Sequence, residues 1–199
     1  MKHRLHIIYI PGIGDHKIAG QQMALRLWRL YGVNVEIIQM NWIVKEPWDT
    51  KFQKILQRVD ELHEADYPVA LVGVSAGASA ALNAYAARKD KISGVACISG
   101  KIQRPETIGQ HYRQEDPAFL TSAKECQTAL KKLNAQDRAH ILCRYGRADN
   151  IVDPADSRID GAHNQQAPTV NHGLNIAFQI IFGAPSIVRF LKKQVRLEK

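Results

Sequence analysis

The sequence predicts an α/β fold: a doubly wound, mostly parallel sheet of about six strands with helices on both faces. The first observation behind this prediction is that short apolar runs alternate with longer segments of helical period along the chain. The second is that 199 residues, with 45% hydrophobic and 23% charged residues, suit a single globular domain over residues 1–199. Right-handed crossovers between parallel strands then leave few possible topologies.

The expected strands are apolar runs with few charges, and they cover residues 6–10, 33–40, 69–74, 92–99, 139–145 and 167–170. The expected helices carry apolar residues at helical spacing, and they cover residues 18–31, 50–64, 76–88, 116–133 and the C-terminal tail, with a break at 183–185. Residues 101–115 have no clear period, and we expect a short cap loop there.

The sharpest local signal is Gly-Val-Ser-Ala-Gly at residues 73–77, which joins an apolar run to an alanine-rich helical segment. This order of strand, tight turn and helix is the pattern of a nucleophile elbow, with Ser75 at the turn. Glycines at 73 and 77 leave room where the strand and the helix pass closest. The helix would direct its first amides, beginning with Ala76, at the space beside Ser75.

Polar residues with catalytic chemistry follow several of the expected strands. Gly12 follows the first strand, Ser75 the third, Asp149 the fifth and His172 the last. In open α/β sheets, ligands bind at the carboxyl ends of the strands, so these residues are expected at one edge. A serine hydroxyl becomes a useful nucleophile when an imidazole takes its proton and a carboxylate orients that imidazole.

The chain order Ser75, Asp149, His172 resembles that of the α/β-hydrolase superfamily, and the resemblance covers essentially the whole length. Residues 73–77 look like its nucleophile elbow, 145–152 like its acid loop and 171–173 like its histidine loop. The resemblance implies a compact, six-stranded, esterase-like serine hydrolase. It also implies an oxyanion hole formed by the backbone amides of Ala76 and Ile13. Pro11 departs from the family pattern, which more often has His before the glycine.

The chain also contains residues that could replace or support this triad. Asp153 is the alternative acid, although before Pro154 it already suits a helix cap. His163 is the alternative base, although it precedes the last expected strand, whereas His172 follows it. The candidate substrate-pocket residues are Gly12, Trp42 and Tyr112, with packing as the other role open to the two aromatic side chains.

The sequence argues against metal and cofactor sites. No metal-ligand spacing is present, and Gly12 and Gly14 lack the third glycine of a dinucleotide fingerprint, whose place Lys17 occupies. We therefore expect no cofactor and no metal. Three cysteines, two of them in expected strands, predict buried thiols and a cytoplasmic location. No apolar segment is long enough for a membrane span, and we expect no stable membrane insertion.

The net charge of +8 is concentrated at the chain ends, because residues 1–10 and 189–199 hold six of the eight excess positive charges. Both ends are expected opposite the catalytic edge, so the charge predicts neither an anionic substrate nor a nucleic-acid partner. The sequence does not specify an oligomeric state.

The favoured function is hydrolysis of a small carboxylic ester through an acyl-enzyme, with an amide or a thioester as the alternative substrate. A second hypothesis is a non-hydrolytic or non-catalytic protein of the same fold, such as a lyase, a ligand receptor or an interaction module. A third is a nucleic-acid or membrane-surface binder that uses the basic C-terminal helix.

Overall fold

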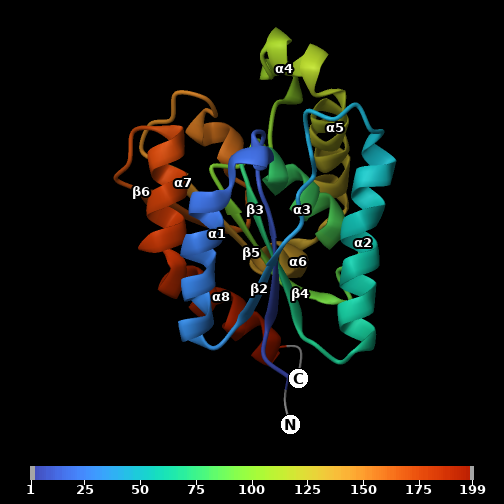
Figure 1. Cartoon of the computed structure of the whole chain (residues 1–199), viewed down its shortest axis with the longest axis vertical. Coiled ribbons are helices and arrows are strands. Elements are labelled where there is room, and N and C mark those ends of the chain that lie inside the picture. The colour runs from blue at the N-terminus through green and yellow to red at the C-terminus, as the bar shows by residue number, and fades with distance from the viewer. Residues whose placement is uncertain (1–2, 198–199) are drawn as a thin grey trace.

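Six parallel strands form one sheet in the computed structural model, which describes residues 3–197 (Figure 1). Their order across the sheet is β2–β1–β3–β4–β5–β6. The bounds are β1 His6–Ile10, β2 Asn34–Ile37, β3 Val69–Val74, β4 Ile92–Ile98, β5 Ile141–Gly146 and β6 His163–Ala167. The central strands β1, β3 and β4 are almost wholly buried, as expected for a parallel sheet covered on both faces.

Helices cover both faces of this sheet. The α-helices are α1 Ala19–Arg26, α2 Trp48–Glu64, α3 Ala76–Ala87, α4 Gln110–Glu115, α5 Pro117–Lys132, α6 Ala135–Ala139, α7 His172–Ile181 and α8 Ala184–Leu197. Short 3-10 helices are η1 Asp15–Lys17, η2 Leu27–Tyr31, η3 Pro105–Thr107 and η4 Pro154–Ser157. One core lies under α1, η2, α7 and α8, and the other lies under α2, α3 and α5 (Figure 1). The predicted doubly wound α/β architecture is confirmed.

Several predicted elements differ in extent. The helix expected over residues 18–31 tightens into η2 after Arg26. The last strand lies at residues 163–167 rather than 167–170, because it is an edge strand whose mostly polar side chains give no apolar run. Residues 101–115 are partly helical, in η3 and α4, although their apolar residues show no helical period.

The chain reverses its winding direction beside β1. From β1 it moves outward to β2, then returns to place β3 on the other side of β1. The loops after β1 and β3 therefore diverge at the same edge and open a crevice between them, which is where ligands bind in such sheets. Gly12 and Ser75 stand at the beginnings of these two loops.

The described part of the chain begins before β1 and ends with α8 at the opposite edge of the sheet from those loops (Figure 1). Three of the charged terminal residues considered above, Lys2, Glu198 and Lys199, lie outside the described residues. Within residues 3–197, no single helix is both long and apolar enough to cross a membrane. The pair α7 and α8 reaches that length and apolarity only together, across a bend of 65°.

Candidate active site

Ser75 occupies a strained turn between β3 and α3. Its φ and ψ are 53° and −118°, a conformation that a non-glycine residue adopts only when the surrounding fold imposes it. The amide of Ser75 donates to the carbonyl oxygen of Ile98 at 2.9 Å, which anchors the turn to β4. A Cβ atom on Gly77 would stand 2.1 Å from the carbonyl oxygen of Ile10, so only glycine lets α3 pass this close to β1.

His172 lies within hydrogen-bond distance of both other candidate residues. Its Nε2 is 3.0 Å from the Ser75 hydroxyl, and its Nδ1 is 2.8 Å from Oδ2 of Asp149. His172 is the first residue of α7, and its backbone amide donates to the side chain of Asn150 at 3.1 Å. With Asp149 ionised, the proton sits on Nδ1, and Nε2 is left to accept from Ser75.

The side chain of Asp149 is buried, and both of its oxygens have hydrogen-bond partners. Its Oδ1 accepts from the amides of Ile151 and Val152, each at 2.9 Å, while Oδ2 faces His172. Burial alone raises the pKa of this carboxyl. The hydrogen bonds from His172 and from the two amides outweigh burial, and the net pKa lies below the ordinary value. Asp149 is therefore an anion at neutral pH.

The two rival residues lie elsewhere. Asp153 points to solvent with a side chain 56% exposed, pairs with Arg104 at 2.8 Å and caps η4 through the amide of Ala155. His163 begins β6 and lies beside Leu142 in the sheet register, with its ring centroid 5.2 Å from that of Phe190. The structure brings Asp149 and His172 to Ser75, and it brings neither rival there.

The loop after β1 lies against Ser75. A Cβ atom on Gly12 would stand 2.8 Å from the Ser75 Cβ and 3.3 Å from its hydroxyl oxygen, so Gly12 borders Ser75 directly. Among residues 3–197, the backbone amides of Ile13 and Ala76 donate to no protein acceptor. One of these unpaired amides, that of Ala76, follows Ser75 directly in the chain, and the other, that of Ile13, follows Gly12, which borders Ser75.

Trp42 does not line the cavity described below, and the structure shows it in the packing role that the sequence also left open. It is 1% exposed, and its rings pack between Trp48 and Phe119. Its indole N–H donates to the carbonyl oxygen of Pro11 at 3.1 Å. The loop after β2 thus turns this side chain into the apolar cluster under α2 and α5.

A second contact joins the loops after β1 and β2. The amide of Asn41 donates to the Asp15 carboxylate at 2.6 Å. The buried ammonium of Lys51 donates to the carbonyl oxygens of Met40 and Asn41, each at 2.7 Å. These buried charges hold the shape of the loop that carries Gly12 and Ile13. Sequence reasoning missed Lys51, since a lysine within a helix gives no sign of burial.

A cavity of about 280 Å³ has an apolar wall and a polar wall, and its lining reaches the loops of Gly12 and Asp149 through Ile13 and Ile151 but does not include Ser75, Asp149 or His172. Its lining is Ile13, Lys101, Arg104, Thr107, Ile108, Gly109, Tyr112, Phe119, Ile151, Val152, Asp153 and Asp156. Half of these residues come from the segment 101–115, including Tyr112, which sequence analysis had singled out. Gly12 is not part of this lining, because it borders Ser75 itself.

The polar wall is a network of paired charges. The buried ammonium of Lys101 bonds to the carboxylate of Asp156, which is 1% exposed, and to the hydroxyl of Thr107. Arg104 bonds to Asp156 and to Asp153, so this wall has no net charge. The network ties the segment after β4 to η4. Sequence analysis did not identify it, because its members are about 50 residues apart in the chain.

Residues 46–172 match the model of the Esterase family, which spans most of the chain and includes Ser75, Asp149 and His172. The chain belongs to the Esterase family. The predicted resemblance is thereby confirmed, and the protein is a serine hydrolase of the α/β-hydrolase type. No curated protein sequence matches the chain.

Solved structures of similar fold include esterases and lipolytic enzymes. A structure from work on the metagenome-derived lipolytic enzymes LipS and LipT superposes with a TM-score of 0.73 at 11% identity, covering 97% of this chain and 95% of that one. Est1E from Butyrivibrio proteoclasticus superposes with a TM-score of 0.72 at 15% identity, covering 98% of this chain and 90% of that one. The esterase domain of a Rhodothermus marinus protein superposes with a TM-score of 0.71 at 14% identity, covering 94% of this chain and 86% of that one. At these identities the likeness concerns the fold.

Proposed function

We propose that Ser75, His172 and Asp149 act as a catalytic triad that hydrolyses a carboxylic ester through an acyl-enzyme intermediate. The observation that carries this proposal is the continuous hydrogen-bonded chain from the Ser75 hydroxyl through His172 to Asp149. His172 takes the proton as Ser75 attacks the acyl carbon and then delivers it to the leaving alcohol. Asp149 fixes the imidazole tautomer and stabilises the imidazolium. A water molecule, which gives its proton to His172, then attacks the acyl-enzyme, and the carboxylic acid is released from Ser75.

The oxyanion that forms in both steps needs donors close to Ser75. The unpaired amides of Ala76 and Ile13 suit this role, and that of Ala76 also carries the positive end of α3. Loss of one such donor costs roughly a hundred- to thousandfold in rate. Both donors are backbone groups, so the hole depends on loop shape rather than on side-chain identity.

The cavity suits a small and uncharged ester. Its volume of about 280 Å³ is at the lower limit of typical ligand pockets. The apolar wall, with Ile13, Ile108 and Phe119, suits a short acyl chain, while the neutral polar wall offers hydrogen bonds without a net charge. The cap formed by residues 101–115 is too short to be a large lid. An amide or a thioester is the alternative substrate.

The test uses a fluorophosphonate probe, which labels activated serines, together with aryl esters of graded acyl length. Wild type should be labelled and should favour short acyl chains, whereas Ser75→Ala should lose both label and turnover. Ser186→Ala, at the start of α8, should behave as wild type. Equal labelling of wild type and Ser75→Ala would refute the proposal. A folded wild-type protein without any turnover would favour a non-catalytic role.

We further propose that the protein works in a reducing compartment such as the cytoplasm. All three cysteines are free and buried in the described part of the chain. Burial raises the pKa of the Cys126 thiol and protects it from reaction. Unchanged stability of the purified protein with and without a thiol reductant is expected, and a stabilising disulfide formed on oxidation would contradict this assignment.

A further inference from the structure

Two long stretches of the chain contain no acidic residue. Neither residues 17–35 nor residues 161–197 include an Asp or a Glu, although the chain has 19 of them in all. The first stretch contains α1 and η2, and the second contains α7 and α8. The acid-free segments thus form the helical layer on one face of the sheet.

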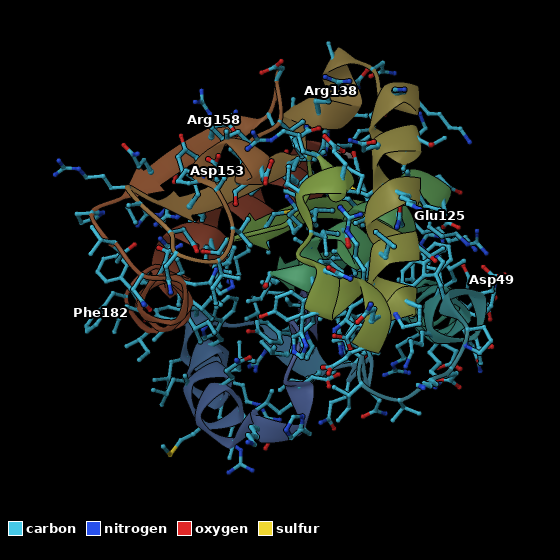
Figure 2. All side chains as sticks on the ribbon, turned by 90° about the horizontal axis from the view of Figure 1, so that it is seen from above. Asp49, Glu125, Arg138, Asp153, Arg158 and Phe182 are labelled. Atoms are coloured by element: carbon cyan, nitrogen blue, oxygen red, sulfur yellow. The ribbon has the colours of Figure 1, made fainter. Side chains whose placement is uncertain are left out.

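This layer exposes several large apolar side chains. On α1 and η2, the exposed fractions are 70% for Met23, 57% for Leu27 and 82% for Leu30. On and just after α7, they are 65% for Leu174, 50% for Ile181 and 71% for Phe182. Figure 2 places Phe182 at the outer margin of the molecule.

The spacing along each helix shows that these are faces and not scattered residues. Leu174, Ile181 and Phe182 stand at positions i, i+7 and i+8, so they share one side of α7. Met23, Leu27 and Leu30 stand at i, i+4 and i+7 on the segment formed by α1 and η2. Helix α1 packs beside α7, and η2 beside α8. We call these six side chains the α1–α7 face.

Basic residues accompany the apolar ones. Arg26, Arg29, Arg189 and Lys193 are exposed on the same helical layer. Lys192 donates to the carbonyl oxygen of Tyr31 at 2.6 Å, which holds a cation at the junction of η2 and α8. Arg189 and Lys193 border the same surface depression as Lys192. No carboxylate from this layer offsets their charge.

We propose that the α1–α7 face docks on the surface of an anionic membrane. Exposed apolar side chains enter the boundary between head groups and acyl chains, and surrounding cations attract anionic head groups. Two copies of the chain would bring like charges together in a symmetric interface. A nucleic acid would leave exposed Leu, Met and Phe side chains without a role. The combination of charge and apolarity therefore fits the lipid surface best.

The protein would dock at the membrane surface, and neither α7 nor α8 would span the membrane. The apolar side of α8, with Ile187, Val188 and Leu191, is buried against the sheet, and α8 turns away from α7 by 65°. Leu174 lies two residues after His172, and Val170, 63% exposed, lies two residues before it. The docked face consequently extends to the edge of the sheet that carries the triad. Docking itself requires no chemistry at Ser75.

The test is sedimentation with vesicles of phosphatidylcholine, with and without one-third phosphatidylglycerol. The wild-type protein should pellet with the anionic vesicles and should be released by high salt. The double variant Leu174→Gln, Phe182→Gln should bind at least about tenfold more weakly. The double variant Arg189→Glu, Lys193→Glu should also lose about tenfold or more. Ser75→Ala should bind as wild type, which separates docking from catalysis.

Matched controls come from other faces of the molecule. Ile43 and Val44 are 52% and 55% exposed in the loop after β2, and their double change to Gln should leave binding unaltered. The double variant Lys131→Glu, Lys132→Glu at the end of α5 should do the same. Equal binding to neutral and anionic vesicles, or α1–α7 variants that bind as wild type, would overturn the proposal. The proposal would also be overturned if the wild-type protein were a dimer and those variants were monomers. The α1–α7 face would then be the interface with a second copy of the chain.

Discussion

The indole N–H of Trp42 donates to the carbonyl oxygen of Pro11 at 3.1 Å, and this buried contact joins the loop after β2 to the loop beside Ser75. Pro11 immediately precedes Gly12, so the contact lies one residue away from the glycine that borders Ser75. Stacking on Trp48 and an edge contact with Phe119 fix the indole in place. A core residue thereby supports the loop that would supply the Ile13 amide to the proposed oxyanion hole.

Trp42→Phe should lower kcat substantially while it causes only a small loss in the free energy of unfolding. Phenylalanine preserves aromatic packing but removes the donor, which leaves the Pro11 carbonyl without its partner. We expect kcat to fall roughly ten- to a hundredfold with KM little changed, because small misplacements in an active site have effects of this size. The measurement is steady-state kinetics on an aryl ester, with urea unfolding alongside.

Trp28→Phe is the matched control. Trp28 is equally buried, and its indole donates to the carbonyl oxygen of Ile180 at 2.8 Å on the other side of the sheet. Both variants lose one buried hydrogen bond and should lose about 1 kcal/mol of stability. Only Trp42→Phe should lose rate. Equal rates in the two variants would show that the Pro11 contact has no part in catalysis.

Asp149→Asn should retain the fold and lose most of the activity. The amide oxygen of Asn can still accept from the amides of Ile151 and Val152, but the side chain no longer holds His172 in the productive tautomer. We expect kcat to fall roughly a thousand- to ten-thousandfold. The rival carboxylate provides the comparison, and Asp153→Asn should lose far less. A larger loss for Asp153→Asn would reverse the assignment of the acid.

Gly12→Ala should impair catalysis through a steric effect. The added Cβ would stand 2.8 Å from the Ser75 Cβ, so either the loop or the serine must move. We expect at least about a hundredfold loss of kcat, the cost of one displaced oxyanion donor. Gly20→Ala is the control, because nothing lies within 4 Å of the added atom and the residue is within α1. It should keep full rate and gain roughly 0.5–1 kcal/mol of stability.

The elements that sequence could predict are those whose own residues carry the signal. The elbow at Ser75 combines an apolar run, two glycines and an alanine-rich helix within 20 residues, and each local preference agrees with the fold. Asp149 and His172 could be placed because each follows a strand in a topology with few alternatives. Strand β6 was misplaced, because an edge strand of polar residues has no apolar pattern to read.

The supporting residues of the site could not be predicted, because their role arises from contacts distant in sequence. The partner of Lys101 is Asp156, and that of Trp42 is Pro11; neither pair shares a motif. Lys51 belongs to a helix with an exposed polar side, and only the arrival of the loop after β2 buries it. Local pattern therefore identifies the candidate reacting groups, while tertiary packing decides which residues support them.

Ionised Asp60 stabilises the folded protein, and this contribution to the free energy of unfolding should be lost in acid. Its carboxylate accepts from Nε of Arg88 at 2.9 Å and from Nζ of Lys91 at 2.7 Å, and so joins α2 to the turn between α3 and β4. The hydrogen bonds from Arg88, followed by those from Lys91, lower the pKa of Asp60 to about 2. The pKa in the unfolded chain is about 3.9, so the folded state favours the anion.

The sign of the effect follows from this difference. Stabilisation is fully present above about pH 4 and is lost as the pH falls toward about 2, where both states bind the proton. Since the pair is partly exposed, we expect about 1 kcal/mol rather than the full value of the shift. Asp60→Asn should therefore be less stable than wild type at neutral pH by that amount. Urea unfolding of both proteins at a series of pH values should show the gap closing with acid, whereas a constant gap would mean that Asp60 acts through packing and not through its charge.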